Sequence, residues 1–454
     1  MKRPFMKKFI YLFVAVFGLF ACSESEDIDI VYPEGSGNEE LPLELAVDSV
    51  QVFKQMLSGH AEASRLGLQF QFSDIEPTGV YVKPNANLQI EVSLLAGSDY
   101  PQLLVGTYSH GDDWNTQPQT YDLHEGMNQI AVNEEGGMLY IRYTADNQPK
   151  GEVKVNFKDG WEHSPLYRYK KTSNANWKRM LAKFSDLPTA TLVGEKEFLV
   201  VSLEKAMEYQ DENQDELLKA IDDILKIQGD LSGMDGSEKI HEPIAHKLLL
   251  VEYSGSDYYM FAYTHRTAYR KSDAIHYVLD PWAIKNEGWG PWHEIGHMHQ
   301  MAAWTWSEIV ESTVNLYSLA VEKEFGITPS RYNRDNRWEE VRNYLALPDD
   351  QRIFNSNQAD VWVRLGMFYQ LQLAFGKHFL KELHKHIRKT QPVIYSKEDK
   401  MRTFMLAACQ VSGKDLSGFF QKWGMNFSNS EAVYEEIANL WLLEPDSDIS
   451  LLTD

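Results

Sequence analysis

The spacing of two histidines constrains the fold of this chain more than any other feature. Residues 293–297 read His-Glu-Ile-Gly-His. Positions four apart on an α-helix lie one above the other on the same face, so this segment predicts a helix that presents His293 and His297 to one ion. Glu294 lies about 100° further around the helix, where its carboxylate can take a proton from a bound water. Gly296 has no side chain and lets another segment approach closely.

This spacing is the His-Glu-x-x-His arrangement of zinc peptidases. Two histidines leave a catalytic zinc ion one protein ligand short, because such an ion has three protein ligands and a water. Apolar side chains in residues 310–321 recur at spacings of four, three and four, which predicts a second helix after a turn at 298–306. The third ligand is therefore expected on this second helix.

Two glutamates at the start of the second helix are candidates for the third ligand. Glu308 and Glu311 are three apart and share a helix face, as do Glu311 and Asn315 at a spacing of four. We favour Glu311, with Asn315 one turn further on and able to hydrogen-bond a ligand. Glu308 remains the alternative ligand, and without a metal site both glutamates would be ordinary solvated residues.

Two segments carry a resemblance to a known family. Residues 293–300, followed by Glu-Ser-Thr-Val-Asn-Leu-Tyr-Ser-Leu at 311–319, resemble the enhancin-like zinc metallopeptidases, family sixty of the metallopeptidases. That family pairs an HExGH helix with a later helix containing Glu-Val-Thr-x-Asn, and this chain departs from it only by Ser312 at the Val position. Residues 366–371 and 415–424 resemble the family's C-terminal helical part, so the resemblance covers roughly residues 70–430.

The resemblance implies more than the spacing alone. It implies that Glu311, and not Glu308, is the third ligand of one catalytic Zn²⁺ ion. It also implies that the substrates are mucins and other glycoproteins.

The length and charge of the chain bound its class. A chain of 454 residues is too long for one core and suggests two or three domains. The net charge of −22 argues against a nucleic-acid partner, because phosphate contacts need clustered Lys and Arg.

The first residues have the features of a secretory signal. Four basic residues precede the apolar run Phe9–Ala21, which is too short to span a bilayer as a helix. The run ends in Leu-Phe-Ala-Cys22, which resembles a bacterial lipobox. Residues 1–21 are thus an expected lipoprotein signal peptide with lipidation at Cys22, and cleavage without lipidation is the alternative. The acidic run 23–27 resembles the surface-export signal of Bacteroidota lipoproteins, which implies an outer-membrane lipoprotein exposed on the cell surface.

Cysteine usage adds one exclusion. With Cys22 lipidated, only Cys409 remains, so an internal disulfide is excluded. Cys409 ends an apolar run and is expected to be a buried residue, not a nucleophile.

The expected fold class is α+β with several domains. An N-terminal antiparallel β-sandwich precedes a zincin-type (gluzincin-like) α/β catalytic domain and a mostly helical C-terminal part. The expected boundaries are 1–21 for the signal peptide, 22–44 for a flexible tether, 45–160 for a short helix plus the sandwich, 161–330 for the catalytic domain, 331–443 for the helical subdomain and 444–454 for a frayed acidic tail.

Apolar patterns predict individual elements. Alternating apolar residues predict strands in the sandwich, whereas short apolar runs predict buried strands in the catalytic domain. One of the last two predicted strands is the expected sheet edge along which a substrate backbone pairs. The predicted strands are 88–94, 139–143, 153–157, 198–201, 248–251, 257–263 and 274–279, and the predicted helices include 45–66 and 216–227.

Aromatic and histidine residues around the motif allow two interpretations. Five tryptophans either pack the two metal helices or form a sugar-stacking surface. His299 is expected to face away from the ligands, and His276 is a candidate for substrate contact. Trp114 and Tyr121 in the sandwich are candidate sugar platforms to which no role is assigned. The five tryptophans are 282, 289, 292, 304 and 306.

The hypothesis with the most support is a secreted, lipid-anchored zinc metallo-endopeptidase that cleaves O-glycosylated, mucin-like proteins. His293, His297 and Glu311 would hold the zinc ion, and Glu294 would act as general base. Two alternatives remain. One is a catalytically silent surface lipoprotein that binds glycans, and the other is a zinc peptidase without a glycan requirement.

Overall fold

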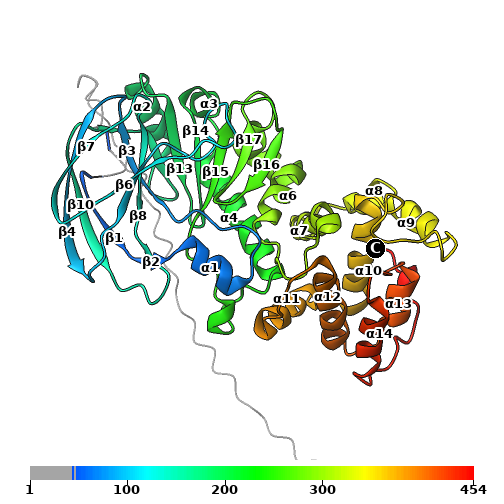
Figure 1. Ribbon diagram of the computed structural model, residues 1–454. Coiled ribbons are helices and arrows are strands. Elements are labelled where there is room, and N and C mark those ends of the chain that lie inside the picture. The colour runs from blue at the N-terminus through cyan, green and yellow to red at the C-terminus, as the bar shows by residue number, and fades with distance from the viewer. Residues whose placement is uncertain (1–42, 45–47) are drawn as a thin grey trace, which may run out of the picture. The chain divides into compact units, whose positions relative to one another are not determined.

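The computed structural model describes residues 43–44 and 48–454 (Figure 1). The predicted signal peptide, Cys22 and nearly all of the predicted tether lie outside the described residues. Within the described part, no helix is both long and apolar enough to cross a membrane.

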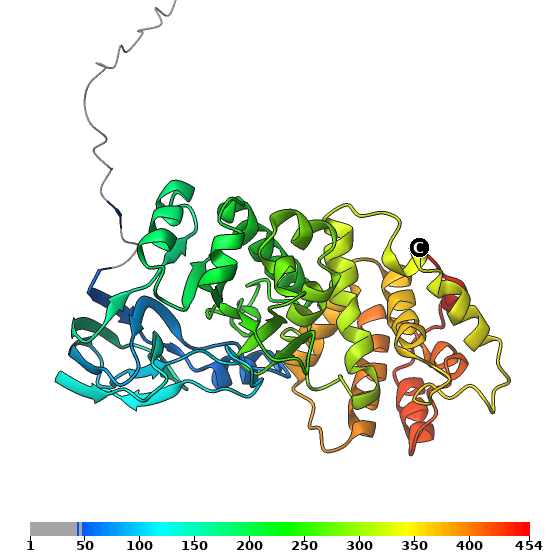
Figure 2. The ribbon, with the colours of Figure 1, turned by 90° about the horizontal axis from the view of Figure 1, so that it is seen from above.

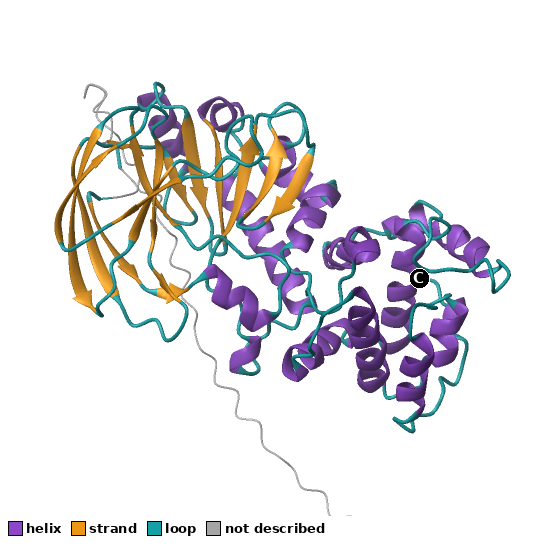
Figure 3. Cartoon of the chain, viewed as in Figure 1, coloured by secondary structure: helices purple, strands orange, loops and turns teal. Residues whose placement is uncertain are grey.

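Two antiparallel sheets form the N-terminal domain (Figure 3). Alternate residues of both sheets share one hydrophobic core that includes Ile90, Leu139 and Val155. The period-two patterns predicted three of these strands correctly. The first sheet has the order β1 (Val50–Lys54), β10 (Glu152–Asp159), β4 (Asn87–Ala96) and β7 (Gly126–Ala131). The second has the order β11 (Glu162–His163), β3 (Glu76–Val82), β8 (Gly137–Arg142), β5 (Gln102–Val105) and β6 (Gln119–Asp122).

The helix predicted for 45–66 is only partly correct. Residues 50–54 pair with β10 as a strand, β2 (Met56–Leu57) pairs with β9 (Thr144–Ala145), and the helix α1 covers only Gly59–Leu66. Ser58 caps this helix by accepting a hydrogen bond from the Ala61 amide. The strand was missed because its exposed valines give no clear period of two.

A mixed six-stranded sheet forms the centre of the predicted catalytic domain. Leu199 and Leu250 on one face pack under the helix α4, while Phe198 and Val251 on the other face share a core with the second N-terminal sheet. The strand β16 lies at the edge of this sheet and pairs only with β17 among the described strands. The order is β12 (Leu166–Arg168), β13 (Thr189–Val193), β14 (Glu197–Ser202), β15 (Leu248–Tyr253), β17 (Arg266–Arg270) and β16 (Met260–Tyr263), and the helices are α2 (Asn174–Lys183), α3 (Leu203–Glu208) and α4 (Gln214–Leu231).

The strand predicted at 274–279 is wrong. Residues Ile275–Val278 form a short 3-10 helix, because the buried positions 274, 275, 278 and 279 follow a helical spacing. The strand predicted at 257–263 is shorter than expected and begins at Met260, while β17 was not predicted.

Helices make up the rest of the described chain. Figures 1 and 2 show the six-stranded sheet (green) between the N-terminal strands (blue to cyan) and the helices that follow residue 330 (yellow to red). Trp304 and Phe404 stack within the helical core. The helices are α5 (Pro281–Asn286), α6 (Trp289–His297), α7 (Val310–Glu324), α8 (Arg331–Arg334), α9 (Arg337–Leu345), α10 (Val361–Phe375), α11 (Phe379–Thr390), α12 (Lys397–Ser412), α13 (Ser417–Lys422) and α14 (Ser430–Ala438).

The prediction of a frayed acidic tail at 444–454 is wrong. Ile449 is buried in the helical core, and the amide of Gln370 donates to the carbonyl of Ser450 over 2.7 Å. The Asp454 carboxylate accepts hydrogen bonds from the Trp338 indole at 2.7 Å and from the Tyr369 hydroxyl at 3.0 Å. The acidic composition predicted an unpacked tail, whereas one buried apolar residue and a few hydrogen bonds are enough to hold the tail against the helices.

A buried arginine connects three parts of the described chain. Arg388 on α11 donates hydrogen bonds to the carbonyl of Leu66 at the end of α1, and to the carbonyls of Ser232 and Gly233 just after α4. It also contacts His241 at 3.0 Å. All of these groups are buried or nearly so, so the guanidinium takes the place of water as their partner.

Candidate metal centre

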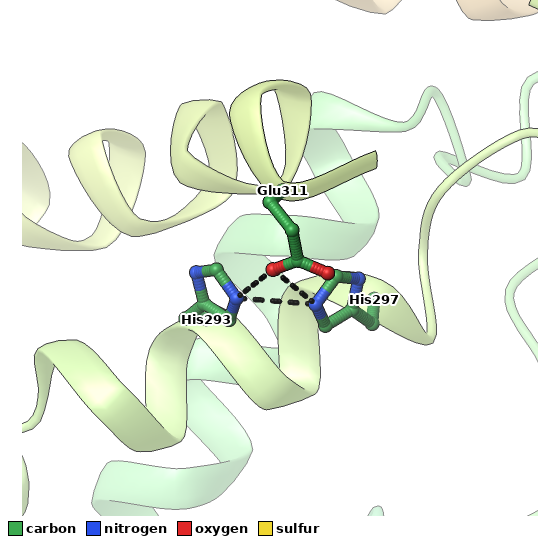
Figure 4. Close-up of side chains that lie close together, drawn as sticks. All are labelled: His293, His297 and Glu311. Carbon is green, nitrogen blue, oxygen red and sulfur yellow. Dashed lines mark hydrogen bonds and ion pairs between the residues drawn. The ribbon is translucent and has the colours of Figure 1, made fainter. Parts of the chain in front are cut away.

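Three predicted ligands come together between α6 and α7 (Figure 4). The Nε2 atoms of His293 and His297 lie 3.1 Å apart. An Oε2 atom of Glu311 lies 3.1 Å from the first and 3.5 Å from the second. The two histidines extend from adjacent turns of α6, and Glu311 reaches over from the first turn of α7.

Each imidazole is fixed in one orientation by a side-chain amide. Nδ1 of His293 donates to the Asn315 carbonyl oxygen at 2.9 Å, and Nδ1 of His297 donates to the Gln300 carbonyl oxygen at 2.8 Å. The amide nitrogens of Asn315 and Gln300 donate to backbone carbonyls, which fixes which end of each amide faces the ring. Both Nε2 atoms of the neutral rings therefore present lone pairs to the centre.

This donor set fits a zinc ion. Two bare imidazole nitrogens and a carboxylate oxygen at such short range repel one another unless a cation lies between them. A tetrahedral zinc with bonds of about 2.1 Å holds its ligand atoms about 3.4 Å apart, close to the separations seen here. Two nitrogens and one oxygen are also ligands that zinc accepts in catalytic sites.

Gly296 explains how the two helices come close enough. A Cβ atom at this position would lie 3.0 Å from Cγ2 of Val314 and 3.1 Å from Cβ of Tyr317, both on α7. The close approach expected at Gly296 is therefore made by α7, which carries the third candidate ligand.

The electrostatics of the centre match its contacts. The adjacent His293 and His297 side chains hold the pKa of the Glu311 carboxyl well below its usual value. Burial lowers the pKa of His293, but the combined effects of Glu311, Glu294 and Asn315 outweigh burial and the net pKa is raised. Glu311 is thus an anion facing two imidazoles, as a ligand carboxylate must be.

Glu294 is placed beside the three ligands and does not join them. Burial raises the pKa of its carboxyl, against the opposing effect of the nearby His293 and His297. A backbone hydrogen bond with Ala262 connects Glu294 to the edge strand β16. A carboxylate with a raised pKa in this place is suited to accept and return a proton.

The alternative ligand and the neighbouring histidines lie elsewhere. Glu308 forms an ion pair with Lys397 at 2.6 Å instead of facing the centre. His299 is buried, donates from Nδ1 to the Ile295 carbonyl and faces away from the ligands as predicted, and burial lowers its pKa to about 4. His276 lies on the 3-10 helix against Tyr277 and has no contact with the centre.

The five tryptophans near the motif differ in burial, which bears on whether they pack the helices or form a sugar-stacking surface. Trp292, Trp304 and Trp306 are buried and pack the helices, whereas Trp282 is 59% exposed. Trp289 is half-buried under Arg331, whose guanidinium lies 4.7 Å from its ring. Cys409 is buried as predicted, and burial raises the pKa of its thiol to about 12.

Sequence reasoning missed two contributors to the centre. Gln300 orients His297 from the turn that follows α6, and its position three residues after His297 was the available signal. The backbone of Ala262 bonds Glu294 from a strand far away in sequence, for which no sequence signal exists.

Comparisons with known families agree with this geometry. The family described as peptidase M60, enhancin and enhancin-like, matches residues 160–424. The N-terminal domain of M60-like peptidases matches residues 58–158.

Solved structures share the fold. A functionally unknown conserved protein from Bacillus anthracis str. Ames is 33% identical, with a TM-score of 0.80 over 89% of this chain and 81% of that chain. The M60 catalytic domain of ZmpC from Clostridium perfringens, solved in complex with the sialyl T antigen, is 19% identical, with a TM-score of 0.74 over 89% of this chain and 82% of that chain.

Curated relatives are longer proteins. TRPM8 channel-associated factor 3 from Rattus norvegicus is 24% identical over 80% of this chain and 39% of its own length. The chain spans about two fifths of the length of the curated relatives it matches.

Proposed function

Because the chain belongs to the family of peptidase M60, enhancin and enhancin-like proteins, we propose that it is a zinc metallo-endopeptidase that cleaves glycoproteins, with O-glycosylated, mucin-like proteins as substrates. The observation that carries this proposal is the complete centre formed by His293, His297 and Glu311, with Glu294 beside it. The mixed sheet with an antiparallel edge strand next to α6 supports a zincin-type (gluzincin-like) catalytic domain.

Different side chains of the centre would hold the metal ion, orient its ligands and transfer the proton. A bound Zn²⁺ would supply Lewis-acid activation of a water molecule and of the scissile carbonyl. Asn315 and Gln300 keep both imidazole rings turned toward the ion. Glu294 takes a proton from the attacking water and returns it to the leaving amine.

The edge strand offers a place for the substrate backbone. Backbone groups on the free side of β16 are available to pair with an extended peptide as an added strand. Ala262 in this strand bonds Glu294, so a peptide on β16 passes directly over the general base.

Support for the glycosylated substrate comes from a structural neighbour. The Clostridium perfringens domain that shares this fold was solved in complex with the sialyl T antigen. For the cellular location, we extend the proposal to an outer-membrane lipoprotein, anchored through lipid on Cys22 and exposed on the cell surface.

Two other functions compete with this one. The curated relatives are named for association with a channel and not for hydrolysis, which favours a silent binding protein. Against it, no ligand and no general base is missing here. A zinc peptidase without a glycan requirement has the same centre and differs only in substrate contacts.

The decisive experiment compares substrates and variants. We expect the zinc-loaded protein from residue 23 onward to cleave a mucin and to lose activity with a chelator. Glu294→Gln should lower kcat by about 10³-fold while keeping its zinc, because only the proton transfer is removed. The measurements are fragment analysis by gel and mass spectrometry, with metal content by atomic emission.

Each outcome separates the hypotheses. No cleavage of mucin or of deglycosylated mucin by the zinc-loaded wild type contradicts the peptidase proposal and favours the silent binding protein. Equal cleavage of both substrates contradicts the glycan requirement alone.

A further inference from the structure

A cavity of about 620 Å³ lies along one side of α4 and reaches the segment that follows the metal helix. We call it the α4 cavity. His299, two residues after the candidate ligand His297, belongs to its lining, although its side chain faces away from the metal centre. The volume is typical of sites that enclose a small molecule. The buried part of the lining includes Phe72, Leu225, Met234, Ile244, His246 and His299.

His299 offers this cavity an unused hydrogen-bond acceptor. Its Nδ1 donates to the Ile295 carbonyl at 2.9 Å, so Nε2 of the neutral ring carries a lone pair. Nε2 has no hydrogen-bond partner among the described residues, although the residue is only 3% exposed. It is still accessible, in contrast to the equally unpaired Nε2 of His241, which is completely enclosed. A buried acceptor without a partner indicates a place for a ligand that donates a hydrogen bond.

The walls beside His299 are apolar and suit a flat ring. The Phe72 ring meets the His299 ring edge-on, with centroids 5.7 Å apart. Phe72, Met234 and Ile244 belong to one hydrophobic core cluster, so this part of the wall is continuous. Aromatic and methionine side chains both make favourable contacts with an aromatic ligand.

Gly229 in the last turn of α4 leaves room in the cavity. A Cβ atom at this position would meet no atom within 4 Å outside the backbone of its own helix. Glycine is a poor helix former, so the open space is kept against the preference of the helix. The neighbouring Gln228 donates from its side-chain amide to the Trp292 carbonyl at 2.7 Å, which holds α4 against α6. The cavity is therefore formed before any ligand arrives.

The charges around the cavity nearly balance. Its lining includes four lysines and five acidic residues. Several of these are already paired, since Lys219 pairs with Asp223, and Asp230 pairs with Lys381 at 2.7 Å. The lining therefore favours neither a strong anion nor a strong cation, and a neutral ligand fits it best.

We propose that the α4 cavity binds a small neutral aromatic molecule with one N–H or O–H group, which donates to Nε2 of His299. Indoles and phenols have this chemistry, because each combines a flat apolar body with a single donor. The occupant would touch the residue that connects the two metal helices, since the Tyr317 hydroxyl donates to the His299 carbonyl at 2.9 Å. The site is separate from the metal centre, and its existence does not depend on the proposed function.

A pair of matched probes tests the role of the donor. Indole carries an N–H group, whereas benzofuran has the same shape and no donor. We expect the zinc-loaded protein from residue 23 onward to bind indole at one site, about three- to tenfold more tightly than benzofuran, because one hydrogen bond is lost. Isothermal titration calorimetry measures both affinities.

Variants of the lining locate the bound probe. Gly229→Leu places a side chain in the open space and should weaken indole binding by more than about tenfold. Gly418→Leu is the matched control on α13, because this helical glycine also has open space around it and does not line the cavity, and it should keep the wild-type affinity. His299→Phe keeps a ring but removes the acceptor, so indole should lose its advantage over benzofuran.

The outcomes decide the proposal without reference to peptide cleavage. Equal affinity of the wild type for indole and benzofuran overturns it, as does the absence of saturable indole binding. Wild-type indole affinity in Gly229→Leu also overturns it, because the probe then binds elsewhere on the protein. If Gly229→Leu fails to fold by circular dichroism, the comparison of the two probes in the wild type and in His299→Phe still decides.

Discussion

The metal centre and the aromatic side chains beside the edge strand β16 are built in opposite ways. The centre draws its three candidate ligands and two orienting amides from residues 293–315, on two consecutive helices and the turn after the first. The aromatic side chains Phe70, Trp114, Tyr258 and Tyr263 come from segments spread over residues 70–263. The difference teaches that the metal centre is specified locally, whereas the aromatic surface beside β16 depends on how distant segments meet.

Replacing each of the two candidate glutamates by alanine should give the largest effect and tests whether the centre is specified locally. We expect Glu311→Ala to lower zinc affinity by more than about 100-fold and to abolish activity, because it removes a ligand. Glu308→Ala is the matched control, and it should lose only the ion pair with Lys397. Metal content after dialysis against a weak chelator measures both. Comparable zinc loss in the two variants would contradict the assignment of Glu311.

Removing the orienting amides should have a smaller effect. Asn315→Ala and Gln300→Ala are each expected to weaken zinc binding by about 10- to 100-fold, because the imidazole ring is no longer held in one orientation. Competition with a fluorescent zinc chelator gives the affinities. Wild-type affinity in both variants would show that the helices alone position the histidines.

The contact between α6 and α7 gives the smallest expected effect. Gly296→Ala should lower the free energy of unfolding by about 1–3 kcal/mol, because the added methyl group meets Val314 and Tyr317. Gly229→Ala in the last turn of α4 is the control, since its methyl group meets no atom within 4 Å, and it should stabilise by up to about 1 kcal/mol. Urea denaturation measures both variants. Equal stability changes would contradict the close helix approach.

The sequence predicted the locally specified features of this chain better than those formed by distant segments. His293, His297, Glu311 and Asn315 were placed together correctly because residues three and four apart on a helix face must be neighbours. The alternating strands were also found, since one buried face imposes a period of two.

Non-local features escaped prediction for physical reasons. Gln300 reaches its histidine only because the chain turns after α6, and the docked tail near Ile449 depends on a surface formed by other helices. Trp114 was considered as a sugar platform without a role. Its place against Tyr258 and Tyr263 depends on contacts distant in sequence, among them the hydrogen bond from Arg266 to the Trp114 carbonyl.

The buried guanidinium of Arg388 has a consequence for protein engineering. Its acceptors lie on α1, just after α4 and on the 3-10 helix at Lys239–His241, while Arg388 itself is on α11. A fragment of residues 161–330 would keep the centre, but it would lack Arg388. The buried carbonyls of Ser232 and Gly233 would then have lost this hydrogen-bond donor. A chimera that receives this candidate metal centre should therefore contain the whole stretch from α1 to α11, because the Arg388 guanidinium, and not the His-Glu-x-x-His motif, sets the smallest part that can be transferred.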